Sequence, residues 1–122
     1  MNIHSDALYL SESQARSRVA GYFYLGDVPT NGKPIAIIVA IYVLCGILKF
    51  VITSAAEAKL GSLFLNCKEW KILRLTLEEM GHPQPPTPAH VDNITAVGIA
   101  NVRKFNSHTL ENDKVTLVKC RF

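Results

Sequence analysis

The hydrophobic pattern in the first third of the chain predicts β-strands. Residues 2–10 and 18–25 are rich in aromatic and β-branched side chains, and a cluster of Gly, Asp, Pro and Asn follows them. Residues 35–48 are uncharged, with five Ile or Val among the first seven, which predicts a buried strand that bends at Gly46. Three successive strands joined by short polar turns predict an antiparallel meander whose third strand is the most deeply buried.

From residue 54 onwards the apolar spacing becomes helical. Apolar residues recur at intervals of three and four in two consecutive sets. The first set comprises Ala56, Leu60, Leu63, Phe64 and Cys67, and the second comprises Trp70, Leu73, Leu77 and Met80. Gly81 then provides a C-terminal cap before a proline-rich loop. The pattern therefore predicts two abutting helices.

The rest of the chain predicts one more strand and one more helix. A short extended piece at residues 89–92 leads into a helix that ends at about Asn101, and the chain then becomes polar without clear periodicity. This order of elements predicts an α/β domain with a mixed sheet. A right-handed crossover would place the fourth strand beside the first and parallel to it, which brings Asp6 and Asp92 onto neighbouring strands.

The apolar run at residues 35–48 raises the alternative of a small membrane-associated protein built on residues 35–52. A bilayer-spanning helix needs about 20 apolar residues, and Lys49 interrupts the run before that length is reached. The N-terminus also lacks the basic start and continuous apolar stretch of a signal peptide. We therefore expect an intracellular protein with no stable membrane partner.

Composition and charge narrow the class further. A chain of 122 residues, 48% of them hydrophobic, fits a single globular domain over residues 1–122. Its three cysteines are widely spaced without a CxxC pair, which excludes a disulfide scaffold and a zinc module and predicts reduced thiols. The net charge of +3 comes entirely from residues 101–122, which hold five basic and two acidic side chains. This basic end is compatible with phosphate binding or with a solvated tail.

Three acidic residues are candidates for chemistry, although each also has a purely structural interpretation. Asp6 suits an edge or solvent-facing position, Glu57 suits a capping box with Ser54, and Asp92 suits a helix N-cap. Together, however, the predicted topology brings the three carboxylates towards one edge of the sheet. Such a cluster is stable only around a cation, and oxygen ligands select Mg²⁺ or Mn²⁺. Two such ions support in-line hydrolysis of a phosphodiester.

Four segments make the chain resemble the ribonuclease H region of copia-type LTR retrotransposon polyproteins. They are HSDALYLSESQARSRVAGYFYLG, SAAEAKLGSLF, LEEMGHPQPPTP and VDNITAVGIAN, and the similarity spans roughly residues 3–105. The resemblance implies a ribonuclease H-like mixed sheet with flanking helices, in which a three-stranded antiparallel meander is joined by a parallel strand. It also implies hydrolysis of the RNA strand of RNA/DNA hybrids with Mg²⁺ or Mn²⁺, next to a reverse transcriptase region that this chain lacks.

The resemblance also implies the site residues. The family's first catalytic Asp falls on Asp6, its Glu on Glu57, and the Asp of its DN pair on Asp92. These side chains would bind metal, and Glu57 would also orient the attacking water. The fourth carboxylate falls on Asp113, 21 residues after Asp92, with Glu111 as a nearby substitute. Arg103 and Lys104 would contact phosphates, and the RNA would be recognised through its 2′-hydroxyls and phosphates.

Several departures from the family pattern indicate an alternative, a catalytically inactive relic that retains some nucleic-acid binding. Lys59 replaces the second Glu of the family's EAE pattern, a change that we expect to be tolerated if residue 59 faces solvent. The third strand is more apolar than in the family, and the basic run before the fourth carboxylate is thinned, which predicts a C-terminus that is truncated or degenerate.

Overall fold

The computed structural model describes residues 1–26 and 39–100 in full, and residues 116–120 by their backbone. The elements follow one another along the chain as β1 (Asn2–Glu12), a short 3₁₀ turn η1 (Ser13–Ala15), β2 (Arg16–Tyr24), β3 (Ala40–Ile47), α1 (Ala55–Glu79), β4 (Thr87–Val91), α2 (Ile94–Ala100) and β5 (Thr116–Cys120).

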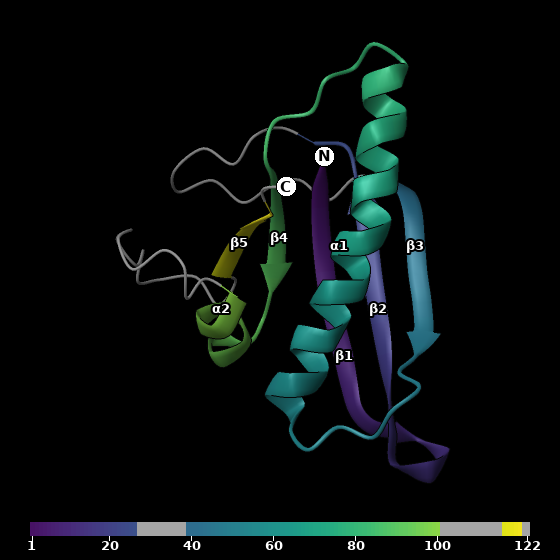
Figure 1. The fold of residues 1–122 in the computed structure, drawn as a ribbon, viewed down its shortest axis with the longest axis vertical. Coiled ribbons are helices and arrows are strands. Elements are labelled where there is room, and N and C mark those ends of the chain that lie inside the picture. Colours follow the sequence, from purple (N-terminus) through teal and green to yellow (C-terminus); the bar gives the residue numbers. More distant parts are fainter. Residues whose placement is uncertain (27–38, 101–115, 121–122) are drawn as a thin grey trace.

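The strands form a five-stranded mixed sheet in the order β3-β2-β1-β4-β5. Strands β1, β2 and β3 form the predicted antiparallel meander, and β4 pairs with β1 in parallel. The α/β class and the position of the fourth strand are therefore as the sequence predicts. The long helix α1 crosses one face of the sheet, over β1 and β2, while α2 lies near the end of β4 (Figure 1).

A single helix, α1, replaces the two abutting helices that the spacing predicted. Its 25 residues run without interruption from Ala55 to Glu79, and Gly81 follows in a left-handed conformation at φ 87°. The two apolar sets are in phase, since Leu63, Cys67 and Trp70 all lie on the buried side. Because no Gly or Pro interrupts the residues between them, nothing ends the first helix.

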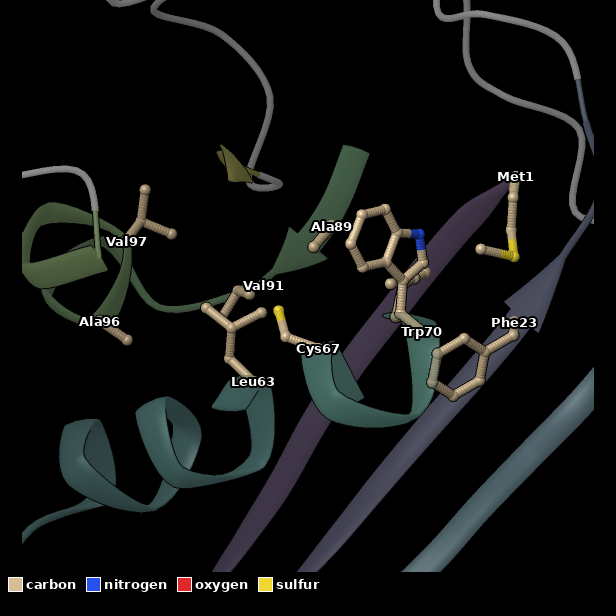
Figure 2. Packing of buried hydrophobic residues seen from close by; sticks show 10 residues of the cluster. Met1, Phe23, Leu63, Cys67, Trp70, Ala89, Val91, Ala96 and Val97 are labelled. Carbon is tan, nitrogen blue, oxygen red and sulfur yellow. The ribbon is translucent and has the colours of Figure 1, made fainter. Parts of the chain in front are cut away.

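The main hydrophobic core lies between α1 and the sheet. Trp70 packs among Met1, Phe23 and Ala89, while Leu63 and Cys67 face Val91 and the side chains of α2 (Figure 2). Trp70, Phe23 and Ile3 are fully buried. Burying such large side chains stabilises the fold by roughly 1.5–3 kcal/mol each, so this cluster fixes α1 against the centre of the sheet.

The third strand is not the most deeply buried one, contrary to the sequence-based prediction. β3 lies at the edge of the sheet, and Val39, Val43 and Ile47 are 85%, 60% and 45% exposed. Among the described strands, the crossover places β4 beside β1, so β1 becomes the central strand and β3 pairs with β2 alone. α1 covers only one face of the sheet, so the other face of β3 stays exposed. Residues 35–38 of the apolar run lie outside the described residues.

Two further findings concern the apolar run and the C-terminal end. In the described part of the chain, no helix is long and apolar enough to cross a membrane. Strand β5, antiparallel to β4, lies in the region where the sequence showed no clear periodicity. The prediction missed it, although Thr116, Leu117 and Val118 favour extended structure.

Candidate functional site

Asp6 and Asp92 lie side by side at one end of the parallel strand pair. Ser5 of β1 is in register with Val91 of β4, so each aspartate is the next residue along its chain. Both side chains are well exposed, at 61% for Asp6 and 60% for Asp92. The topology thus brings together two of the carboxylates that the sequence analysis singled out.

Lys59, in the second turn of α1, joins the two aspartates. Its Nζ lies 2.7 Å from Oδ1 of Asp6, and 2.5 and 2.6 Å from Oδ1 and Oδ2 of Asp92. The lysine side chain is only 15% exposed, far less than either aspartate. The condition under which we expect the change at residue 59 to be tolerated, exposure to solvent, is therefore not met. The side chain lies beside the parallel pair β1 and β4 and donates to both carboxylates.

The electrostatics of the cluster favour a charged lysine. Burial on its own would lower the pKa of Lys59, but the hydrogen bonds and negative charges of Asp6 and Asp92 outweigh it and raise that pKa above its ordinary 10.5. The hydrogen bonds from this ammonium to the two carboxylates are charge-assisted, because donor and acceptor are both ionised. At neutral pH the ammonium of Lys59 therefore supplies the positive charge that two adjacent aspartates require.

Glu57 does not join the aspartates. Its Oε2 accepts hydrogen bonds from the backbone N–H of Thr53 at 2.8 Å and from the Thr53 hydroxyl at 2.7 Å. These bonds lower the pKa of Glu57. An α-helix turns about 100° per residue, so positions 57 and 59 point to opposite sides. Residue 59, rather than residue 57, occupies the helix position that faces the aspartates.

The helix start resembles the predicted capping box but differs in one partner. The Ser54 hydroxyl accepts a hydrogen bond from the backbone N–H of Glu57 at 3.1 Å, as expected of an N-cap. The glutamate side chain reaches back to Thr53 instead of the Ser54 amide. Glu57 therefore has a structural role that accounts for its position.

Asp92 is not the N-cap of α2, contrary to its structural interpretation in the sequence analysis. Asn93 takes that role, because its Oδ1 accepts a hydrogen bond from the backbone N–H of Ala96 at 2.9 Å. The carboxylate of Asp92 is thereby left to pair with Lys59. In the DN pair, Asn93 therefore caps α2 and Asp92 pairs with Lys59.

A buried polar network behind Asp6 fixes the helix at this point. The Ser62 hydroxyl donates to the backbone carbonyl of Asp6 at 2.6 Å. One turn further along α1, the amide nitrogen of Asn66 donates to the Ser5 hydroxyl at 2.8 Å and to the carbonyl of Ala20 at 3.0 Å. Sequence analysis missed this network, because isolated Ser and Asn in a helix give no signal of burial. These hydrogen bonds fix the distance between α1 and β1, and at this distance the side chain of Lys59 reaches both aspartates.

Among the described residues, an ammonium lies between Asp6 and Asp92, where a metal ion would bind. The oxygens of Asp6 and Asp92 are donors suited to Mg²⁺ or Mn²⁺, but the ammonium of Lys59 already lies within hydrogen-bond distance of both. No group of three or more His, Cys, Asp or Glu side chains that could hold a metal occurs among the described residues. A metal ion would have to displace the lysine, and the described residues would then offer it the carboxylates of Asp6 and Asp92.

Four other residues named by the sequence analysis lie outside the described residues. These are Arg103, Lys104, Glu111 and Asp113. Their assignments as phosphate contacts and as the fourth carboxylate stay predictions. The structure therefore bears on three of the four proposed ligands, and it brings Asp6 and Asp92 together while it separates Glu57 from them.

No family model, no curated protein and no solved structure matches this chain.

Proposed function

We propose that this chain is a ribonuclease H-like domain, derived from a copia-type retrotransposon, that recognises RNA/DNA hybrids without hydrolysing them. The observation that carries the proposal is the pairing of Lys59 with both Asp6 and Asp92, at distances of 2.5–2.7 Å. Support for the family comes from the sequence segments that resemble it. The topology is compatible with it, because an antiparallel meander is followed by a helix and a strand parallel to β1.

The chemistry of the lysine argues against hydrolysis. In two-ion hydrolysis, one metal ion generates the attacking hydroxide and the other stabilises the leaving oxygen. The ammonium of Lys59 offsets part of the negative charge of the aspartates, but it has no open coordination position at which to bind and activate water. Asp6 and Asp92 therefore keep their arrangement while the centre loses the group that performs the reaction.

The same substitution favours binding of nucleic acid in the absence of metal. With a glutamate at position 59, as in the family pattern, the cluster would carry three negative charges and repel a phosphate backbone unless cations were bound. With Lys59 the cluster carries two negative charges and one positive charge. The basic excess of residues 101–122 adds attraction for phosphates. Recognition of the RNA strand would use its 2′-hydroxyls.

Metal-dependent hydrolysis through Asp6, Glu57, Asp92 and Asp113 is the alternative that the resemblance implies. It requires Lys59 to leave both aspartates and Glu57 to give up its two hydrogen bonds to Thr53. Because the observed contacts oppose both movements, we favour the non-hydrolytic function.

The test measures cleavage and binding of a fluorescent RNA/DNA hybrid in parallel. We expect the unmodified protein to bind the hybrid equally well in EDTA and in Mg²⁺, more tightly than it binds a DNA duplex, and to cleave in neither Mg²⁺ nor Mn²⁺. Lys59→Glu should weaken binding in EDTA, and Mg²⁺ should restore it. Lys68→Glu is the matched control, since Lys68 is an exposed residue of the same helix.

Two results would contradict the proposal in different ways. Cleavage by the unmodified protein that is lost in Asp6→Asn would establish a working nuclease and overturn the non-hydrolytic function. Binding no tighter to the hybrid than to the DNA duplex would overturn hybrid recognition.

A further inference from the structure

The outer edge of β3 is an unpaired strand edge among the described residues. β3 is the end strand of the sheet, and it pairs with β2 along one side from Tyr24↔Ala40 to Arg18↔Ile47. The amide and carbonyl groups on its other side therefore have no strand to bond to in the described part of the chain. Such an edge is a template for pairing with another extended chain.

This edge lacks the features by which proteins block edge-to-edge pairing. Residues 39–48 contain no charged side chain and no proline, and Lys49 is the first charge after them. Side chains of Tyr42 and Leu44 pack against the main core, which holds β3 firmly in the sheet. On the other face, Ile41, Val43 and Cys45 are exposed.

We propose that β3 pairs with β3 of a second copy of this chain, antiparallel, with Val43 opposite Val43 at the two-fold axis. Residues directly opposite each other in an antiparallel pair point to the same face of the sheet. This register therefore matches the exposed residues of one copy with those of the other, and Ile41 lies opposite Cys45. It also keeps α1 of both copies on the same face of a continuous ten-stranded sheet, twice the five strands of one copy.

The chemistry of β3 favours a second copy of this chain as the partner that pairs with its outer edge. The unpaired backbone groups require an extended segment, and the neutral, apolar side chains offer no charge with which to attract an acidic or basic peptide. β3 itself is such a neutral, β-branched segment. Pairing a strand with itself about a two-fold axis closes the assembly at a dimer, whereas pairing with a different edge would continue without end.

The experiment measures molar mass by size-exclusion chromatography with light scattering over a range of protein concentrations. We expect a concentration-dependent dimer. Val43→Lys should raise the dissociation constant about tenfold or more, because it places two like charges opposite each other at the axis. Val51→Lys is the matched control, since Val51 is equally exposed, at 63% against 60% for Val43, and lies outside β3. Circular dichroism confirms that each variant is folded.

Cross-linking tests the register separately. Val43→Cys should form a covalent dimer under mild oxidation, because the two cysteines would face each other across the axis. The unmodified protein should not cross-link, although Cys45 is exposed, because Cys45 would lie opposite Ile41. A monomer at all concentrations would overturn the proposal, as would a dimer that Val43→Lys leaves unchanged. Assemblies that grow without limit would overturn the two-fold closure.

Discussion

The ammonium nitrogen of Lys59 lies within 2.6 Å of both carboxylate oxygens of Asp92, a residue 33 positions away in the chain. The same nitrogen contacts Asp6, so one side chain of α1 connects the two strands of the parallel pair. A helix, a central strand and the strand after the crossover meet at this point. The topology places Asp6 and Asp92 side by side, and the positive charge of Lys59 offsets the repulsion between their carboxylates.

Replacing Lys59 with methionine should destabilise the domain. Methionine keeps most of the length of the side chain but removes the positive charge that pairs with Asp6 and Asp92. Both aspartates are about 60% exposed, so water screens their repulsion, and we expect a loss of about 1 kcal/mol in the free energy of unfolding. Urea unfolding measures it, with Lys68→Met as the control. The loss should shrink in high salt. Equal stability of the two variants at low salt would show that the ion pair contributes nothing.

Glu57 should behave as a capping residue. Glu57→Gln keeps an oxygen that can accept from Thr53, so we expect it to leave the stability nearly unchanged and to have no effect on hybrid binding. Ser54→Ala, which removes the N-cap itself, should cost about 1 kcal/mol. Thermal unfolding of both variants, with and without Mg²⁺, provides the comparison. If Mg²⁺ raises the melting temperature of the unmodified protein but not that of Glu57→Gln, Glu57 is a metal ligand.

Substitutions at Val39 and Val19 distinguish the observed sheet, with β3 at its edge, from the predicted sheet, with the third strand at its centre. A third strand in the centre of the sheet would make Val39→Asp unfold the protein. Val39 is 85% exposed, so we expect Val39→Asp to change the stability by no more than about 0.5 kcal/mol. Val19, on β2, is 1% exposed, and Val19→Asp should unfold the domain because it buries an unpaired charge. Circular dichroism on both variants decides, and unfolding of Val39→Asp would contradict the edge position.

The predictions from sequence succeeded where neighbouring residues decide the structure. The first two strands, the helix start at Ser54, its end at Gly81 and the strand before Asp92 all follow from local patterns. The parallel pairing of β4 with β1 follows from the handedness of the crossover. The burial of β3 did not follow, because an apolar strand has the same sequence pattern at the centre and at the edge of a sheet.

The sequence likewise predicted only part of the candidate site, because local patterns do not fix how α1 is rotated. Adjacency of Asp6 and Asp92 follows from topology, but the helix residue that faces them depends on the rotation of α1 about its own axis. The sequence analysis chose Glu57, whereas Lys59, about 200° away around the helix, is the residue that faces the aspartates. The buried bonds of Ser62 and Asn66 hold that rotation, and they are visible only in the structure.

The tight contact between β2 and α1 gives a matched pair of glycine variants. A Cβ at Gly21 would lie 2.0 Å from Oδ1 of Asn66 and 2.7 Å from its Cγ, whereas a Cβ at Gly46 would meet only Cγ2 of Val19 at 3.8 Å. Gly21→Ala should therefore destabilise the domain by about 1–3 kcal/mol, because Asn66 is held by hydrogen bonds and cannot move away freely. Gly46→Ala should be neutral or slightly stabilising. Urea unfolding of both variants measures the difference, and equal effects would exclude the clash.

Stability should fall on mild acidification because of a stacked histidine pair on the neighbouring strands β1 and β4. The rings of His90 and His4 stack with centroids 4.6 Å apart, and His4 also hydrogen-bonds with the hydroxyl of Tyr24. Burial, and next the neighbouring His4, lower the pKa of His90 from 6.5 to about 4. Burial also lowers the pKa of His4. Nε2 of His90 has no hydrogen-bond partner among the described residues, so these residues offer no acceptor for a proton there.

The lowered pKa fixes the direction of the pH dependence. Above pH 6.5 His90 is neutral in both the folded and the unfolded chain, so its contribution is fully present there. As the pH falls from 6.5 to about 4 the unfolded chain binds the proton first, and folding loses up to about 3 kcal/mol. His90→Phe keeps a stacked ring that does not titrate, so its stability should fall less over this range. Urea unfolding at a series of pH values measures both proteins. Parallel pH profiles would show that His90 does not carry the effect.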